Sequence, residues 1–359
     1  MGSRPERRVS ASDSQANEES FSAKAGQPMA TSESPNISLV TSVANKPRAW
    51  FRSMLSADNA FRWLMTLAAL AVLAAVGLII AELVERSSLA WHQFGIRFFF
   101  GSDWDPVSGN FGAWPFIYGT LVSSFVALLI AVPLALAVAV FVTEMCPKPL
   151  RKPISYATEL LAAIPSVIYG LWAIFVLVPL LRVHVNPLLI KSLGWTGLFR
   201  GPDYGYSMFS AAVVIAIMIV PIISSITREV MTAVPQQQRE AVLALGATRW
   251  EMIRMGVLRN ARAGILGGII LGLGRALGET MAVTMVIGNR PEIARSLFAP
   301  GYTMASVIAN EFSEATGDLY LSSLVQIGLA LFLVTIVVNI LAQFLVWTVT
   351  RGTPARTHA

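Results

Sequence analysis

The hydrophobic pattern of the chain consists of long apolar runs separated by short polar segments. Most runs hold about 20 residues or more, the length that a helix rising about 1.5 Å per residue needs to cross about 30 Å of hydrocarbon. The pattern predicts an all-α membrane protein with six transmembrane helices. They are expected near residues 61–84, 114–143, 154–181, 207–227, 261–287 and 321–349.

The composition agrees with a membrane protein, because 55% of the 359 residues are hydrophobic and 13% are charged. The net charge of +6 comes from basic residues in loops rather than on one continuous face, which argues against nucleic-acid binding. The single cysteine, Cys146, excludes an intramolecular disulfide and a cysteine-based zinc site. With no metal-ligand spacing and no catalytic motif, the sequence predicts neither a metal site nor an enzyme.

The ends of the chain differ from its apolar centre. Residues 1–50 are rich in Ser, Ala and Glu and lack a long apolar run, so they are predicted to be a disordered cytoplasmic tail. The first run begins near Phe61, too late for a cleaved signal peptide. Residues 51–350 would form the transmembrane domain and 351–359 a short tail. Basic loops place both termini in the cytoplasm, although the basic segment 182–206 must then be external.

Prolines interrupt three of the runs, at Pro133, Pro165 and Pro221. Proline removes a backbone donor and tends to kink a helix, and such breaks often line a pathway; a plain packing role is equally open. The break at Pro165 is the most informative because polar groups surround it, and these need partners inside a membrane. The candidate residues of this pathway break are Glu159, Pro165, Ser166 and Tyr169.

The fifth run contains Arg275 and Glu279, although a charge within the membrane costs about 2.5 to 3.5 kcal/mol on insertion scales. In a continuous helix their spacing places both on one face, where they can neutralise each other. The guanidinium can also offer a planar fork to an oxyanion. Together with Thr280, they are the candidate substrate-pathway residues, and a purely structural ion pair remains the alternative.

Glycines recur every four residues in the same run, at Gly264, Gly268 and Gly272. Small residues at this spacing let the backbone of another helix come close. The spacing predicts a tight partner helix, in this chain or in another subunit.

The loop between the fourth and fifth runs, about residues 229–260, is too long and too patterned for a simple connector. Pro235 suits the first helical position, Gly246 suits a helix end, and Thr248 with Glu251 forms a capping box. These signals predict a cytoplasmic helix-turn-helix with an apolar surface for a partner. An amphipathic pair of helices lying on lipid headgroups is the alternative.

The order Glu240-Ala241, then Gly246, then Leu258 resembles the signature loop of ABC importer permeases, which is Glu-Ala-Ala, three residues, Gly, nine residues, Ile-any-Leu-Pro. This chain departs from the pattern at Val242, Gly256 and Arg259. In that family the loop docks into a groove of the ATPase subunit. The resemblance implies an ATPase-coupling role for Glu240, Ala241, Leu245, Gly246 and Leu258.

Four further segments resemble the permeases of phosphate-specific ABC importers, and the resemblance covers roughly residues 60–350. The segments are 116–122, 159–170, 271–289 and 309–315. The resemblance implies a type I ABC importer permease fold in the inner membrane and import of inorganic phosphate. It also implies a heterodimer with a second phosphate permease, a dimeric cytoplasmic ATPase and an extracytoplasmic phosphate-binding protein.

ATP and magnesium are expected on the partner ATPase, because the sequence contains no Gly-x-x-x-x-Gly-Lys-Ser/Thr loop. A secondary, ion-coupled carrier is the main rival, since Arg and Glu inside a membrane also suit ion coupling. The loop over about residues 229–260, called the docking loop from here on, favours the ABC importer.

Overall fold

The computed structural model describes residues 57–350, and these are almost entirely helical. Within them, six helices are long and apolar enough to cross a membrane, which confirms the predicted number of spans. The spans are Asn59–Arg86, Trp114–Met145, Ser166–Thr196, Met208–Thr232, Arg249–Leu277 and Asp318–Thr348. The tails predicted at 1–50 and 351–359 lie outside the described residues.

Five long helices and several shorter ones make up this part of the chain. The long helices are α2 (Ala57–Arg86), α4 (Trp114–Val140), α9 (Met208–Thr232), α12 (Arg259–Leu277) and α15 (Asp318–Thr350). The shorter ones are α3 (Ser88–Phe94), α5 (Lys148–Ala163), α6 (Ser166–Trp172), α7 (Val178–Leu180), α8 (Asn186–Leu193), α10 (Gln236–Ala244), α11 (Arg249–Glu251), α13 (Met281–Val286) and α14 (Met304–Glu311). Two short strands, β1 (Trp104–Asp105) and β2 (Asn110–Phe111), pair antiparallel.

Some helical turns are wider or tighter than an α-helix. The π-helical segments are η2 (Phe141–Met145), η3 (Ala173–Leu177), η4 (Leu181–Val185) and η6 (Met252–Leu258). The 3₁₀ segments are η1 (Gly95–Phe99) and η5 (Gly194–Thr196). Contacts divide the chain into two units, 1–68 and 69–359, and the packing below concerns the second.

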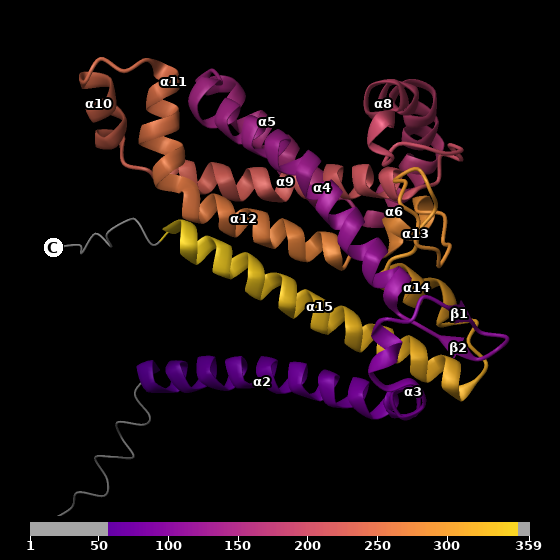
Figure 1. Cartoon of the computed structure of the whole chain (residues 1–359). Coiled ribbons are helices and arrows are strands. Elements are labelled where there is room, and N and C mark those ends of the chain that lie inside the picture. The colour runs from indigo at the N-terminus through magenta and orange to yellow at the C-terminus, as the bar shows by residue number, and fades with distance from the viewer. Residues whose placement is uncertain (1–56, 351–359) are drawn as a thin grey trace, which may run out of the picture. The chain divides into compact units, whose positions relative to one another are not determined.

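Helix α9 forms the centre of the packing because both α4 and α12 contact it, and α12 also contacts α15 (Figure 1). Two thirds of its most apolar stretch is buried, the largest share of any described span. Pro221 lies inside α9 and Pro133 inside α4, and both helices continue through them. Among the three prolines, Pro165 alone separates two helices.

The third span does not have the predicted bounds of 154–181. Helix α5 ends at Ala163, and the span itself runs from Ser166 to Thr196, through much of the segment predicted as an external loop. The reason is that Leu181, Val185 and Leu189 recur every four residues and pack against the core. Basic residues at other positions hid this helical face from the sequence pattern.

The docking loop and the hairpin lie at opposite ends of the second unit. Figure 1 shows α10 and α11 at one end and β1, β2 and α14 at the other.

At the hairpin end, Tyr302 is 2% exposed and its hydroxyl accepts a hydrogen bond from Asn310 Nδ2 at 2.8 Å. Burial raises the pKa of the Tyr302 phenol above its usual value. This phenol is therefore a structural, neutral group of the hairpin end.

Candidate functional site

The fifth run is interrupted, so the predicted continuous helix over 261–287 is wrong. Helix α12 ends at Leu277, and α13 begins at Met281. The Thr280 hydroxyl donates to the Gly278 carbonyl at 3.2 Å, and the Ala282 amide donates to Glu279 Oε1 at 3.4 Å. Side chains thus replace helical hydrogen bonds here, as an interruption at membrane depth requires.

A second interruption separates α5 from α6. Ile164 and Pro165 have extended backbone, with ψ of 130° and 138°. The Tyr169 hydroxyl reaches back across the break and donates to the Leu161 carbonyl at 2.8 Å. Tyr169 is buried, and its hydroxyl supplies a side-chain donor to a carbonyl in the last turn of α5.

The two interruptions lie next to each other because α6 packs against α13. A Cβ atom at Gly170 would stand only 3.1 Å from the Ala282 Cα, so the absence of a side chain permits this approach. The structure therefore brings the predicted residues at Pro165 together with those at Glu279.

Arg275 and Glu279 differ in their surroundings. Arg275 is exposed on α12, whereas Glu279 is 9% exposed within the break. In the described part of the chain no ion pair joins them, because the helix ends between the two residues. The expected mutual neutralisation is therefore absent from this conformation, and Arg275 is exposed on the surface of this chain.

Glu159 lies apart from the interruptions. Its carboxylate pairs with Arg228 of α9 at 3.6 Å, and Arg228 also donates to the Thr158 hydroxyl at 3.2 Å. Glu159 and Arg228 border a cavity of about 540 Å³ that Ser155, Ser225 and Glu229 also line. Glu159 thus joins α5 to the end of α9, rather than lying with Arg275.

The glycines of α12 face α9 of the same chain. A Cβ atom would lie 2.5 Å from Val230 at Gly264, 3.1 Å from Ile226 at Gly268 and 2.7 Å from Ile223 at Gly272. The close partner helix is therefore internal.

The docking loop contains α10, a turn and a second helical stretch that leads without a break into α12. Gly246 has a φ of 82°, a left-handed conformation that favours glycine, and Thr248 with Glu251 forms a capping box. Leu245 is 88% exposed and Trp250 is 62% exposed. Of the other coupling candidates, Glu240 and Ala241 are exposed, whereas Leu258 is partly buried and packs against the neighbouring apolar cluster.

Residues 131–351 match the family described as binding-protein-dependent transport system inner membrane component. The phosphate transport system permease protein PstC of Mesorhizobium japonicum is 47% identical over 311 residues, which cover 86% of this chain and 95% of that protein. PstC of Pasteurella multocida is also 47% identical, over 272 residues that cover 75% of this chain and 85% of that protein.

The chain belongs to the PstC permease family. Its fold agrees with a solved structure of this class. A bacterial ABC transporter involved in the import of the acidic polysaccharide alginate matches with a TM-score of 0.57 and 17% identity, over 85% of this chain and all of that one. The likeness shows that this PstC-family chain has the type I ABC importer permease fold.

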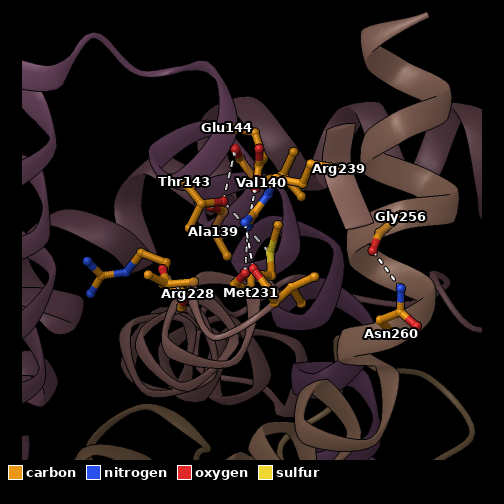
Figure 2. Close-up of polar contacts among 11 residues, drawn as sticks. Ala139, Val140, Thr143, Glu144, Arg228, Met231, Arg239, Gly256 and Asn260 are labelled. Carbon is orange, nitrogen blue, oxygen red and sulfur yellow. Dashed lines mark hydrogen bonds and ion pairs between the residues drawn. The ribbon is translucent and has the colours of Figure 1, made fainter. Parts of the chain in front are cut away.

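Sequence reasoning missed one pair of residues in this PstC-family permease. Glu144, on η2 at the end of the second span, forms an ion pair with Arg239 of α10 at 3.1 Å (Figure 2). The sequence did offer one signal for Glu144, because a carboxylate in the last turn of an apolar run needs a partner. The sequence held no signal for its partner, which lies 95 residues away and among many other arginines.

Proposed function

We propose that the chain is the transmembrane permease subunit of an ABC importer that moves inorganic phosphate into the cytoplasm. The observation that carries the proposal is the exposed Arg275 beside two adjacent helix interruptions. The PstC relatives, named as phosphate transport permeases, support this substrate. A guanidinium presents parallel donors to a phosphate oxyanion, and the hydroxyl and backbone groups of an interrupted helix add further donors.

The transport complex contains several further subunits in this proposal. A second, PstA-type permease forms the heterodimer, and a PstS-type extracytoplasmic protein delivers phosphate. A PstB-type ATPase dimer hydrolyses ATP with magnesium and contributes the chemistry that this chain is expected to lack. The ATPase contacts α10 and the turn that follows it, where Glu240 and Ala241 of α10 and Leu245 and Gly246 of the turn are exposed.

ATPase closure moves the docking loop and switches the permease between outward and inward access. Because the loop follows the fourth span, contact with the ATPase places the loop, and with it both termini, on the cytoplasmic side. The carrier rival would need no such loop, and the ABC permease fold favours the importer.

The test is uptake of labelled phosphate by cells that lack their own importer and receive the full set of subunits. Arg275→Ala should abolish most uptake while the complex still assembles, and Arg275→Lys should restore part of it because the charge returns without the planar fork. Arg97→Ala is the control, because it removes an exposed arginine that is distant from Arg275 in the sequence. Normal uptake by Arg275→Ala would remove Arg275 from the pathway.

A further inference from the structure

One guanidinium joins three helical elements at the docking-loop end. Arg239 Nη2 lies 3.1 Å from Glu144 Oε1 and donates to the Met231 carbonyl at 2.8 Å, while Nη1 donates to the Val234 carbonyl at 2.7 Å. Figure 2 shows the Glu144 and Arg239 side chains directed toward each other. Helix α10, segment η2 and the end of α9 are thereby linked through Arg239.

This ion pair is shielded from solvent. The side chain of Glu144 is 9% exposed and that of Arg239 is 15% exposed. A largely shielded charge that loses its partner keeps little compensation, so opening the pair is unfavourable. The pair therefore attaches α10 to η2.

Apolar packing gives α10 little support of its own. No residue of α10 is buried, and a cavity of about 490 Å³ opens beside the pair. Val242 is the α10 residue that packs, partly buried, against the local apolar cluster of Met231, Val234, Met252, Ile253 and Val257. The Glu144–Arg239 pair is thus a principal anchor of α10.

The segments around the pair depart from regular α-helix. Both η2 and η6 are π-helical, a form that occurs mostly as local distortions at functional sites. In η2 the Thr143 hydroxyl donates to the Ala139 carbonyl at 2.8 Å and lies 3.9 Å from the Met231 sulfur. On the exposed side of the loop, Leu245 and Trp250 offer apolar surface to a partner.

We propose that the Glu144–Arg239 ion pair transmits the movement of the docking loop to the second span and to α9, and is required to couple ATP hydrolysis to transport. The inference rests on the proposed function, in which an ATPase binds the loop. Both residues are positioning residues, because they act through the helices that they join.

The experiment uses the complete transporter reconstituted in liposomes, with phosphate uptake and ATP hydrolysis measured together. Glu144→Gln and Arg239→Lys each leave the pair incomplete. The double variant Glu144→Met, Arg239→Met replaces it with apolar side chains of similar size, which preserves folding. The matched control is Glu82→Gln, which removes the carboxylate from an exposed ion pair with Arg86.

Glu144→Gln and the double variant should retain the bound ATPase but lose about tenfold in phosphate moved per ATP hydrolysed, because an incomplete or absent pair no longer fixes α10 to η2. Arg239→Lys should lie between these and wild type, and Glu82→Gln should match wild type. An unchanged ratio in the double variant would overturn the proposal. So would failure of every pair variant to assemble, because the pair would then serve folding. A wild-type complex that hydrolyses ATP without taking up phosphate would instead contradict the proposed function.

Discussion

Val242 of α10 lies directly over Gly256 of η6: a Cβ atom built on Gly256 would stand 3.4 Å from the Val242 Cγ2. These are two of the three positions at which the loop departs from the Glu-Ala-Ala pattern, which has Ala and Ile there. The larger of the two side chains lies on α10 in this chain and on the second helix in the pattern, so the two departures offset each other in part in volume. The turn between the helices is kept, with Gly246 in its left-handed conformation.

The contact predicts that substitutions at Val242 and Gly256 have non-additive effects on stability. Gly256→Ile alone should overpack the contact and destabilise the loop by about 1 to 3 kcal/mol. Val242→Ala alone should cost about 1 kcal/mol through lost burial. The double variant should be more stable than the sum of the two effects, because the small residue makes room for the large one. Thermal melting of the purified complex measures the cycle, and strict additivity would contradict the compensation.

The glycine contacts of α12 predict opposite effects at neighbouring positions. Gly264→Ala should destabilise the chain by about 1 to 3 kcal/mol, because its Cβ would lie 2.5 Å from the stiff Val230 side chain of α9. Gly267→Ala is the matched control, since nothing lies within 4 Å of its Cβ position. Melting temperatures in detergent should fall for the first variant and hold or rise for the second. Equal melting temperatures would mean that α12 and α9 are not closely packed in solution.

The hydrogen bond from the Tyr169 hydroxyl to the Leu161 carbonyl predicts that Tyr169 stabilises the break between α5 and α6. Tyr169→Phe leaves the ring in place but removes one of the two donors to the Leu161 carbonyl, which keeps the bond from the Ile164 amide, so the expected cost is about 1 kcal/mol for one lost hydrogen bond. Amide hydrogen exchange should accelerate around Leu161 and Ile164 while α9 is unaffected. Unchanged exchange at the end of α5 would show that the hydrogen bond does not hold the break together.

Tyr302 predicts a loss of stability at alkaline pH. Burial raises the pKa of its phenol, so the folded chain keeps this proton to a higher pH than the unfolded chain, whose tyrosines titrate near about pH 10. The unfolded state then binds fewer protons, and stability falls as the pH rises above about 10. Thermal melting from about pH 8 to about pH 11 should show a shallower decline for Tyr302→Phe than for wild type. Parallel curves would exclude this phenol as a source of the alkaline sensitivity.

The number of spans could be predicted from the sequence, because an apolar helix in a membrane needs only length and composition. The bounds of the third and fifth spans could not. In the third, the packed positions Leu181, Val185 and Leu189 recur at helical spacing, but intervening basic residues lowered the average hydropathy. In the fifth, Gly278 and Thr280 end a helix through local hydrogen bonds that an apolar window does not detect.

The polar residues of the candidate site can be picked out from the sequence one by one, but their arrangement could not be predicted. The polar groups near Pro165 and the charges near Glu279 are visible as costly residues in apolar runs. Their adjacency depends on α6 packing against α13, which brings together segments more than 100 residues apart. Glu159 shows the same limit, since it lies on α5 whereas its partner Arg228 belongs to the fourth span.

The interruption between Leu277 and Met281 is held by bonds within its own segment, from Thr280 to Gly278 and from Ala282 to Glu279. Both bonds join residues no more than three positions apart, so the shape of the break is written into a short stretch of sequence. A substitution at Glu279 or Thr280 would therefore alter the break directly, without first disturbing the contacts between distant helices.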